Sequence, residues 1–514
     1  MALRPTLKAI PLIRDDRFAL LRVRGTDLAA LKRHVFKRYP VHEWGTFFRF
    51  GFRRTSWGLA LSYVDPILPL PGDLDRQSGM TVFRDQYTRR AFQQAANPAG
   101  LAVGVVHSHP EGYRTSPSPL DNDMDDYFSR ELSAFSGGSP YCSFILQESE
   151  TTGLTVSGRV YDRGEWFPLR WLLEAAGDTL GRTLSELVTL LDARDPVGTN
   201  EESTSARLES LFGERAAARL RTSKLGIIGG SGTGSPAAEV LCRAGVEEFV
   251  LVDPQRFARS NLERLHGSVH ADAANPKTRP YKVDILRRML AEINPAVRIT
   301  SFAGNILHAN VLDELLRCDL LIGTTDTFHG RAALSDLASH YLLPSVDVGV
   351  LMDGANGKVT TQLVELNRYH PDLSCAFCSG LIDPGALAEE LMTEAEREAR
   401  KQAAIEAVKR GDAADQYWKG RPRQLNTVGY LTTAAGALAA GYAEGWLTGT
   451  FNMPHDRFQF DISQPRLSVV APTRQRDAKC SCSKHLGWAD QANSFRSVVL
   501  PPHWSKRAIL TAKV

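Results

Sequence analysis

The sequence predicts an α/β protein with two parts, an α+β part in residues 1–165 and a doubly wound α/β part in residues 205–450. At 514 residues the chain is longer than one hydrophobic core usually supports. Short apolar runs bounded by Pro and Gly fill the first part, among them TFFRFGF and LAVGVVHSHP, and they are typical of a mixed sheet. The second part opens with a strand, a glycine turn and a helix in KLGIIGGSGTGS, followed by the strand EEFVLVDP.

Two further stretches complete the expected organisation. Residues 166–204 are predicted to form a helical segment, WLLEAAGDTLGRTLSELVTLL, and a polar linker, DARDPVGTNEESTSAR. Residues 386–424 are rich in Ala, Glu, Lys and Arg, which predicts an exposed helical insertion in the second part. Residues 451–514 form a C-terminal segment.

Composition limits the classes of partner. The chain is 43% hydrophobic and 23% charged, as in ordinary globular proteins, and its net charge of +3 gives no basis for binding nucleic acid or an anionic membrane. The N-terminus lacks the long apolar core of a secretory signal. The stretch from Thr427 to Thr448 is built from Ala, Gly and Thr and predicts a buried helix, not a membrane span. We therefore expect a cytoplasmic protein without nucleic-acid or membrane partners.

A candidate catalytic metal site lies in the first part. His107 and His109 stand one residue apart at the end of a predicted strand, so both imidazoles point to the same side. Asp121 would supply a third ligand, and three protein ligands with one open position are typical of catalytic zinc. Ser118, one helical turn earlier, could hydrogen-bond a developing oxyanion, and Glu43 is the candidate general base.

The competing interpretation is that the two histidines are incidental and that DNDMDDY is a solvated loop. The ordered set of five residues favours a metal. It resembles the JAMM/JAB (MPN) metalloprotease family over residues 1–165. This resemblance implies hydrolysis of a peptide or isopeptide bond after a ubiquitin-like C-terminus. Family members that have lost the motif are scaffolds.

The glycine turn of the second part contains Gly229, Gly232 and Gly234, with Ser231 in place of the middle glycine of the strict Gly-x-Gly-x-x-Gly motif. By itself this turn fits an NAD-dependent dehydrogenase equally well. Polar residues that follow shift the balance, because an adenylating enzyme must neutralise a triphosphate and hold magnesium. These residues are Asp253, Asn261, Arg264, Lys282 and Asp326, with Arg331 beyond.

In this order the residues resemble the ThiF/MoeB family, the Rossmann-like adenylation core of ubiquitin-activating enzymes. The resemblance implies that Asp253 binds the ribose of ATP and that Asp326 holds magnesium. It assigns the phosphates to Asn261, Arg264 and Lys282. Arg207 falls where the family places an arginine that reaches the ATP of a neighbouring subunit, although Arg215 and Arg219 are alternatives. Besides Ser231, Gln255 departs from the pattern, because a second acidic residue is common there.

The cysteines predict a structural zinc site. Cys375 and Cys378 form one close pair, and Cys480 and Cys482 form another, so four thiolates could bind one zinc. His485 could replace one ligand, and a redox Cys-x-x-Cys is the competing interpretation. Activating enzymes similar to the ThiF/MoeB family that form a thioester place the reactive cysteine after the first zinc pair, and this chain has none between Cys378 and Cys480. By this resemblance we expect an acyl-adenylate whose acyl group passes directly to a thiol acceptor, either a conjugating-enzyme-like protein or a sulfur donor.

Together the two resemblances imply processing or deconjugation of a ubiquitin-like protein ending in glycine, and adenylation of its C-terminus. Such fusions occur in bacterial ubiquitin-like conjugation pathways, some of them antiviral. One alternative is activation of a sulfur-carrier protein for cofactor or cysteine biosynthesis. Another is a non-catalytic scaffold that binds a ubiquitin-like tail, and a third is an NAD-dependent oxidoreductase. The second resemblance also implies a homodimer.

Overall fold

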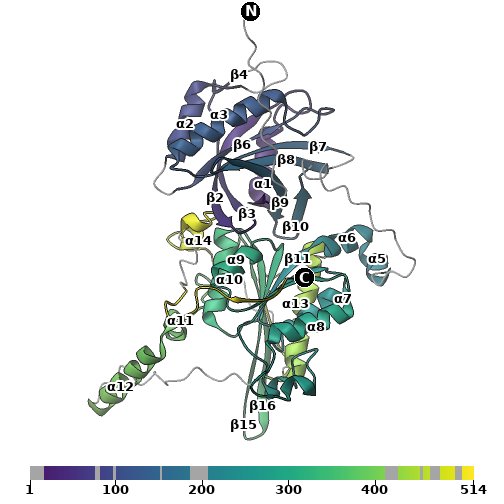
Figure 1. Cartoon of the computed structure of the whole chain (residues 1–514), viewed down its shortest axis with the longest axis vertical. Helices are drawn as coiled ribbons and strands as arrows, with labels where there is room; N and C mark the ends of the chain where they lie inside the picture. The colour runs from purple at the N-terminus through teal and green to yellow at the C-terminus, as the bar shows by residue number, and fades with distance from the viewer. Residues whose placement is uncertain are drawn as a thin grey trace, which may run out of the picture. The chain divides into compact units, whose positions relative to one another are not determined.

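A computed structural model describes residues 17–75, 82–96, 100–150, 153–185, 206–410, 427–451, 455–463, 475–492 and 500–513 (Figure 1). The chain folds into two compact units. Unit 1 comprises Met1–Ser203, Ser339–Leu343 and Lys484–Ser494, and unit 2 comprises Thr204–Ala338, Pro344–Ser483 and Phe495–Val514.

The main sheet of unit 1 is closed on itself. In order of pairing its strands are β1 (Phe18–Arg24), β3 (Gly58–Ile67), β2 (Gly45–Thr55), β6 (Ala102–Ser108), β7 (Tyr141–Ser149), β8 (Gly153–Asp162), β9 (Glu165–Ala175) and β10 (Leu180–Leu184). A small second sheet pairs β4 (Leu74–Asp75) with β5 (Val82–Phe83). Because β1 runs parallel to β3 on one side and to β9 on the other, the sheet from β1 to β9 forms a ring, and β10 extends from β9.

Helices pack on both faces of this sheet. They are α1 (Gly25–Val35), α2 (Asp85–Ala95) and α3 (Pro119–Phe135). Successive residues of β2 point to opposite faces, so Phe48 joins the cluster that contains α1 while Phe47 joins the cluster that contains α2 and α3. This second cluster fixes α3 through buried Phe128 and Leu132. The helix that carries Asp121 is therefore held against the strand that carries His107.

The helical prediction for residues 166–204 is wrong where the structure describes it. Residues 165–175 and 180–184 are the antiparallel strands β9 and β10, joined by a turn in which the Ala176 amide donates to the Thr179 carbonyl at 3.1 Å. Strand β9 also pairs with β8 and β1, so tertiary strand pairing overrides the helical periodicity of this segment. The part of the predicted linker before residue 206 lies outside the described residues.

Unit 2 contains a doubly wound sheet with antiparallel edges. In order of pairing its strands are β17 (Arg457–Asp461), β16 (Lys358–Tyr369), β15 (Ser345–Ala355), β14 (Leu320–Gly323), β11 (Lys224–Ile228), β12 (Glu248–Val252), β13 (Arg298–Ala303) and β18 (Ile509–Lys513). From β15 to β13 all neighbours are parallel, whereas β16, β17 and β18 run antiparallel to their neighbours. The chain proceeds from β11 to β12 and β13 on one side, and then crosses to β14 on the other. Ligands bind at such a switch point, beyond the carboxyl ends of the strands.

The described part of unit 2 also contains helices, several of which cover its sheet. They are α5 (Ala206–Phe212), α6 (Glu214–Thr222), α7 (Gly234–Arg243), α8 (Lys282–Ile293), α9 (Ala309–Leu315), α10 (Phe328–His340, whose last two residues fall in unit 1), α11 (Pro384–Leu391), α12 (Glu394–Arg410), α13 (Gly429–Thr448) and α14 (Ser481–Lys484), with short 3-10 helices at Arg259–Asn261 and His270–Ala273 (Figure 1). A third 3-10 helix, Asp490–Ala492, belongs to unit 1.

The Ala- and Gly-rich stretch is the helix α13, which packs against α6, α7 and β15. The prediction of a buried helix is confirmed. None of the helices in the described part of the chain is both long and apolar enough to span a bilayer. In the predicted insertion, residues up to 410 are helical in α11 and α12, and residues 411–424 lie outside the described part.

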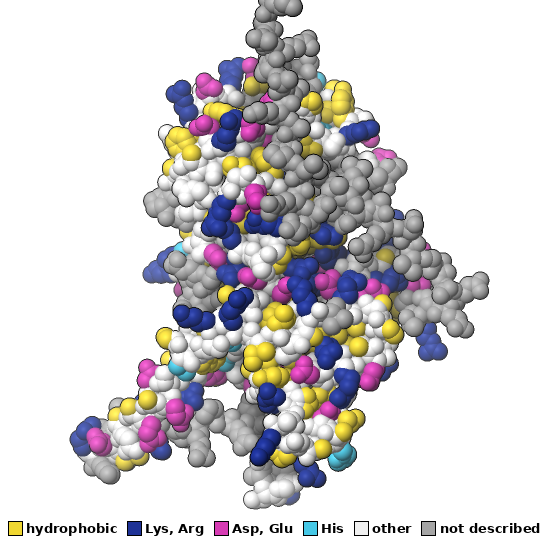
Figure 2. Space-filling model, in the orientation of Figure 1, with side chains coloured by type: hydrophobic (Ala, Val, Ile, Leu, Met, Phe, Trp, Pro, Cys, Tyr) yellow, Lys and Arg dark blue, Asp and Glu magenta, His cyan; other side chains and the backbone are white. Residues whose placement is uncertain are grey.

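Basic and acidic side chains are interspersed over the face of the molecule that Figure 2 shows. This distribution agrees with the small net charge of the chain.

Candidate functional site

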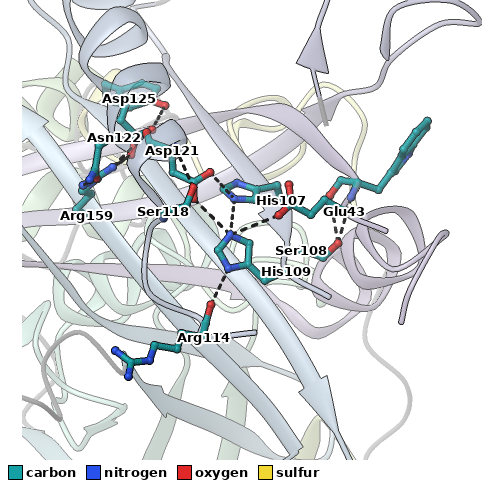
Figure 3. Close-up of polar contacts among 12 residues, drawn as sticks. Glu43, His107, Ser108, His109, Arg114, Ser118, Asp121, Asn122, Asp125 and Arg159 are labelled. Atoms are coloured by element: carbon teal, nitrogen blue, oxygen red, sulfur yellow. Dashed lines mark hydrogen bonds and ion pairs between the residues drawn. The ribbon is translucent and has the colours of Figure 1, made fainter. Parts of the chain in front are cut away.

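The two histidines and the aspartate of the predicted metal motif converge in unit 1 (Figure 3). His107 lies on β6, His109 directly follows this strand, and Asp121 lies in the first turn of α3. Nε2 of His107 is 3.1 Å from one Asp121 oxygen, and Nε2 of His109 is 3.4 Å from the other. The two Nε2 atoms are 3.3 Å apart.

These spacings fit a tetrahedral zinc ion. Nitrogen and oxygen ligands lie about 2.0–2.2 Å from zinc, so two of them at the tetrahedral angle are roughly 3.3 Å from each other. The three side chains are also largely buried, at 4% to 10% exposed. Without a cation between them, two buried imidazole nitrogens and a carboxylate would have to share protons, so the donor set itself favours a metal.

Neighbouring groups orient His109 and shift the pKa values of His109 and Asp121. Nδ1 of His109 is 2.7 Å from the Arg114 carbonyl oxygen, and with Nδ1–H donating to this oxygen, Nε2 is left as the ligand atom. Burial alone would lower the pKa of His109, but the contacts with Asp121 and the Arg114 carbonyl outweigh it and raise the pKa. Burial acts against ionisation of Asp121 as well, yet hydrogen bonds from the two histidines bring its pKa well below its usual range.

A buried ion-pair network supports the turn of α3 that carries Asp121. Arg159 of β8 donates to Asp125 at 2.7 Å, to the Asn122 side chain at 2.7 Å and to the Asp121 carbonyl at 3.3 Å (Figure 3). Tyr141 of β7 donates to the second oxygen of Asp125, also at 2.7 Å. Sequence reasoning missed Arg159, because it lies far along the chain from the motif.

Ser118 and Glu43 lie beside the three ligands. Ser118 is the N-cap of α3: its hydroxyl accepts from the Asp121 amide at 3.3 Å, and its own amide donates to the Asp121 carboxylate at 2.6 Å. Glu43 precedes β2 by two residues and places a carboxylate oxygen 3.9 Å from Nε2 of His109.

In unit 2 a cavity of about 450 Å³ lies at the switch point of the sheet. Its wall is formed by the segments that follow β11, β12, β13 and β14 and by part of β15. Seven of the predicted nucleotide-site residues line it: Gly229, Gly232, Asp253, Asn261, Arg264, Lys282 and Asp326. Gly234 and Arg207 do not line it, and Arg207 is an exposed residue of α5.

Two positions of the glycine turn have no room for a side chain. Gly229 has a φ of 101°, and a Cβ atom there would lie 2.7 Å from the Thr324 hydroxyl. A Cβ atom on Gly234 would lie only 1.9 Å from the Gly229 carbonyl oxygen, so Gly234 shapes the turn from outside the cavity. Ser231 lines the cavity in place of the usual glycine.

Backbone amides fix the carboxylate of Asp253. It accepts from the Gly230 amide at 2.7 Å and from the Gln255 amide at 2.8 Å. Burial raises its pKa, and the positive charge of Lys282 opposes this shift. Lys282, the first residue of α8, donates to the Gln255 side chain. Gln255 is therefore the partner of the predicted phosphate lysine, which gives this departure from the family pattern a structural role.

Several residues of this cavity were not singled out by their sequence context. His329 and Asn305 line it, with Nε2 of His329 2.8 Å from the Asn305 side-chain nitrogen, and Trp504 adds a wall from the C-terminal segment. Arg331, which the sequence pattern did include, also lines the cavity, and its Nε lies 3.5 Å from a carboxylate oxygen of Asp347. Burial raises the pKa of Asp347 to about 6, although Arg331 acts against this shift.

The four predicted zinc cysteines also converge, within unit 2. Sγ of Cys375 is 3.6 Å from Sγ of Cys480, and Sγ of Cys378 is 3.8 Å from Sγ of Cys482. Zinc–sulfur bonds of about 2.3 Å place tetrahedral sulfurs roughly 3.8 Å apart, so four thiolates fit one zinc. His485 does not belong to this group. The remaining cysteines, Cys142, Cys242 and Cys318, are buried.

A doubly wound sheet with a cavity at its switch point is the arrangement that nucleotide-binding α/β proteins share. The chain belongs to the ThiF family, which matches residues 204–482. This match covers unit 2 from its first residues to the second cysteine pair.

Curated relatives match part of the chain. The chain is 27% identical over 165 residues to the SAMP-activating enzyme E1 of Haloferax volcanii, which is 32% of this chain and 57% of the relative. It is 31% identical over 144 residues to the adenylyltransferase and sulfurtransferase MOCS3 of Drosophila virilis, which is 28% of this chain and 31% of the relative. It is 28% identical over 120 residues to the sulfur carrier protein adenylyltransferase of Thermus thermophilus, which is 23% of this chain and 42% of the relative. The chain thus spans between about a third and a little over half of these relatives.

Among solved structures, MccB of E. coli with ATP matches with a TM-score of 0.40 and 15% identity, over 56% of this chain and 75% of that chain.

Proposed function

We propose that unit 2 adenylates the C-terminal carboxylate of a ubiquitin-like protein with ATP. The observation that carries this proposal is the convergence of seven widely spaced polar and glycine residues on one cavity in a chain of the ThiF family. The names of the relatives support the class of substrate, since they include a SAMP-activating enzyme E1, a ubiquitin-like modifier-activating enzyme and a sulfur carrier protein adenylyltransferase.

Each residue has a role in this proposal. The turn from Gly229 to Gly232 approaches the phosphates with its backbone, and Asp253 binds the ribose hydroxyls. The phosphates are bound by Asn261, Arg264 and Lys282. Asp326 would hold magnesium, which neutralises phosphate charge when bound. Arg207 would reach the ATP of a second subunit in a homodimer.

The proposed reaction is a nucleophilic substitution at phosphorus. A carboxylate oxygen of the C-terminal glycine attacks the α-phosphorus of ATP, and the bond to the pyrophosphate oxygen breaks. Lys282 and Arg264 stabilise the charge that develops on the phosphates. A thiol of a conjugating-enzyme-like protein, or the sulfur of a sulfur donor, then attacks the acyl carbon, and the bond to the phosphate oxygen breaks with release of AMP. Transfer to a sulfur donor would correspond to activation of a sulfur-carrier protein. The names of the relatives support this alternative.

Exchange of labelled pyrophosphate into ATP tests this function. The full chain is incubated with ATP, magnesium and a small ubiquitin-like protein ending in glycine. Exchange that depends on that protein is expected, and Lys282→Ala should reduce it by a factor of about 10² to 10³. Lys277→Ala, an exposed lysine outside the cavity, is the matched control and should leave exchange unchanged. Absence of exchange with the wild-type chain would favour a non-catalytic scaffold.

We propose a second activity for unit 1, zinc-dependent hydrolysis of a peptide or isopeptide bond after a ubiquitin-like C-terminus, as in the JAMM/JAB family. The supporting observation is the group of His107, His109 and Asp121 at tetrahedral spacing with Glu43 beside it. The zinc would supply Lewis acidity. Glu43 would act as general base and later return the proton to the leaving amine, and Ser118 would donate a hydrogen bond to the oxyanion.

Cleavage of a ubiquitin-like protein extended past its glycine tests this second activity. Loss of cleavage in Glu43→Gln, with zinc still bound, would support the proposal. Equal cleavage by the variant and the wild-type chain would contradict the role of Glu43.

A separate zinc in the four-cysteine group would be structural. Closely spaced free thiols also suit the reducing cytoplasm that we propose as the location.

A further inference from the structure

The C-terminal segment of unit 2 is fixed to the edge of the sheet beside the proposed ATP site. Strand β18 pairs with β13, and the Ala508 backbone exchanges two hydrogen bonds of 3.0 Å with the Asn310 side chain. A Cβ atom on Gly304 would lie 2.2 Å from the Cβ of Ala508, so the segment approaches the end of β13 closely. We call residues 500–508 the C-terminal strap.

The strap carries Trp504 into the wall of the cavity. Its ring lies edge-on against His329, with ring centroids 5.3 Å apart. His329 is itself fixed on both ring nitrogens, by the Asn305 side chain at 2.8 Å and by Glu390 of α11 at 3.0 Å. The indole of Trp504 therefore lies against an imidazole whose position is fixed by two contacts.

Trp504 lines two adjoining cavities. One is the proposed ATP cavity, and the other is an apolar cavity of about 390 Å³ lined by the strap and the end of β13. The two cavities share Pro254, Gly304 and Asn305 with Trp504. A flat apolar surface beside an amide and backbone polar groups is the kind of site that binds a heterocyclic base, by stacking on its face and hydrogen bonding to its edge.

The order of the proposed contacts places the base at this end. The phosphates lie at the glycine turn and Lys282, and the ribose lies at Asp253 after β12. The next strand outward is β13, whose carboxyl end carries Gly304 and Asn305. We propose that Trp504 stacks on the adenine base of ATP and that the strap thereby sets the preference of the site for a purine. This inference rests on the proposed ATP-dependent function.

Binding of ATP and CTP to the full chain tests the role of Trp504. Trp504→Ala should raise the Kd for ATP roughly 10-fold, because stacking of a purine on an aromatic ring is lost, and should change the Kd for CTP much less, because a pyrimidine stacks over a smaller area. The preference for ATP over CTP should therefore fall. A merely structural role would weaken both nucleotides equally. Lys506→Ala, on an exposed part of the same strap outside both cavities, is the matched control.

Intrinsic fluorescence provides a readout that does not require the alanine variant to fold. ATP should quench the wild-type chain, and Trp504→Phe should bind ATP with a Kd within about 2-fold of wild type but lack this quench. Trp171→Phe, in unit 1, should retain the quench. Two results with a wild-type chain that binds ATP would overturn the inference and leave the proposed function standing. One is an unchanged preference for ATP over CTP in Trp504→Ala, and the other is an unchanged fluorescence quench by ATP in Trp504→Phe. If the wild-type chain binds no ATP, the proposed function falls and the inference with it.

Discussion

The two candidate sites are assembled in different ways. The metal group of unit 1 takes its three ligands from fifteen consecutive residues, 107 to 121, at the end of one strand and the start of one helix. The cavity of unit 2 takes its wall from segments spread over residues 228 to 504, and the sheet topology brings them together. A locally encoded site depends on the orientation of a few side chains, whereas a topologically encoded site depends on the backbone of the whole sheet.

The largest expected effect is loss of hydrolysis at the locally encoded site. Glu43→Gln should reduce peptide-bond cleavage by a factor of about 10² to 10⁴, because the general base is removed. His109→Ala should abolish cleavage and lower the zinc content measured by atomic absorption. In both variants, pyrophosphate exchange by unit 2 should stay at the wild-type rate. A parallel loss of exchange would show that the two sites are not independent.

A backbone change should damage the topologically encoded site most. Gly234→Ala places a methyl group 1.9 Å from the Gly229 carbonyl, which should cost roughly 3 kcal/mol in the free energy of unfolding and abolish ATP binding. Gly441→Ala, in α13, is the control, because its Cβ would have no neighbour within 4 Å. Denaturant unfolding and ATP titration would measure the pair. Equal behaviour of the two variants would contradict the role assigned to the turn.

Removal of the four-thiolate site should have a smaller effect, confined to unit 2. Cys378→Ser should lower the free energy of unfolding by on the order of 2 kcal/mol, since a structural zinc contributes folding energy. Zinc content should fall by one ion per chain while cleavage by unit 1 continues. Cys242→Ser, a buried cysteine outside the group, is the control. An unchanged zinc content in Cys378→Ser would contradict a metal at this position.

The smallest effect concerns Glu444 of α13, whose carboxylate has no charged partner among the described residues. Burial raises the pKa of Glu444 on α13 to about 6, from 4.5 in the unfolded chain. A carboxyl with a raised folded pKa lowers the free energy of unfolding as pH rises from about 4.5 to about 6, and the loss persists above that range. Glu444→Gln should therefore be more stable than wild type by roughly 1 to 2 kcal/mol at pH 8 and equal to it at pH 4. Thermal unfolding at the two pH values measures this, and a difference that grows toward low pH would contradict it.

The same contrast explains what the sequence could predict. The spacing of His107, His109 and Asp121 predicted their convergence because short-range backbone geometry controls it. In unit 2 the doubly wound topology was predictable from strand, glycine turn and helix, so residues at strand ends such as Asp253 and Asp326 could be assigned to one cavity from the sequence alone.

Residues brought in by tertiary structure could not be predicted. Trp504 is more than two hundred residues from Asp253, and nothing in the sequence around it marks a wall of the cavity. Arg159 supports Asp121 through the pairing of β7 with β8, and no local motif encodes that contact. The segment after Glu165 was wrongly predicted to be helical because its apolar residues belong to a strand with neighbours on both sides. Gln255 became understandable only through its contact with Lys282.

The closure of the unit 1 sheet has a consequence for any shortened form of the protein. Strand β1 is hydrogen-bonded on both sides, to β3 and to β9, although it is the first strand of the described chain. Deleting it would uncover two unpaired β edges at once, and such edges recruit strands from other molecules. A fragment of unit 1 that begins after Arg24 should therefore self-associate, whereas one that keeps Phe18–Arg24 should remain dispersed.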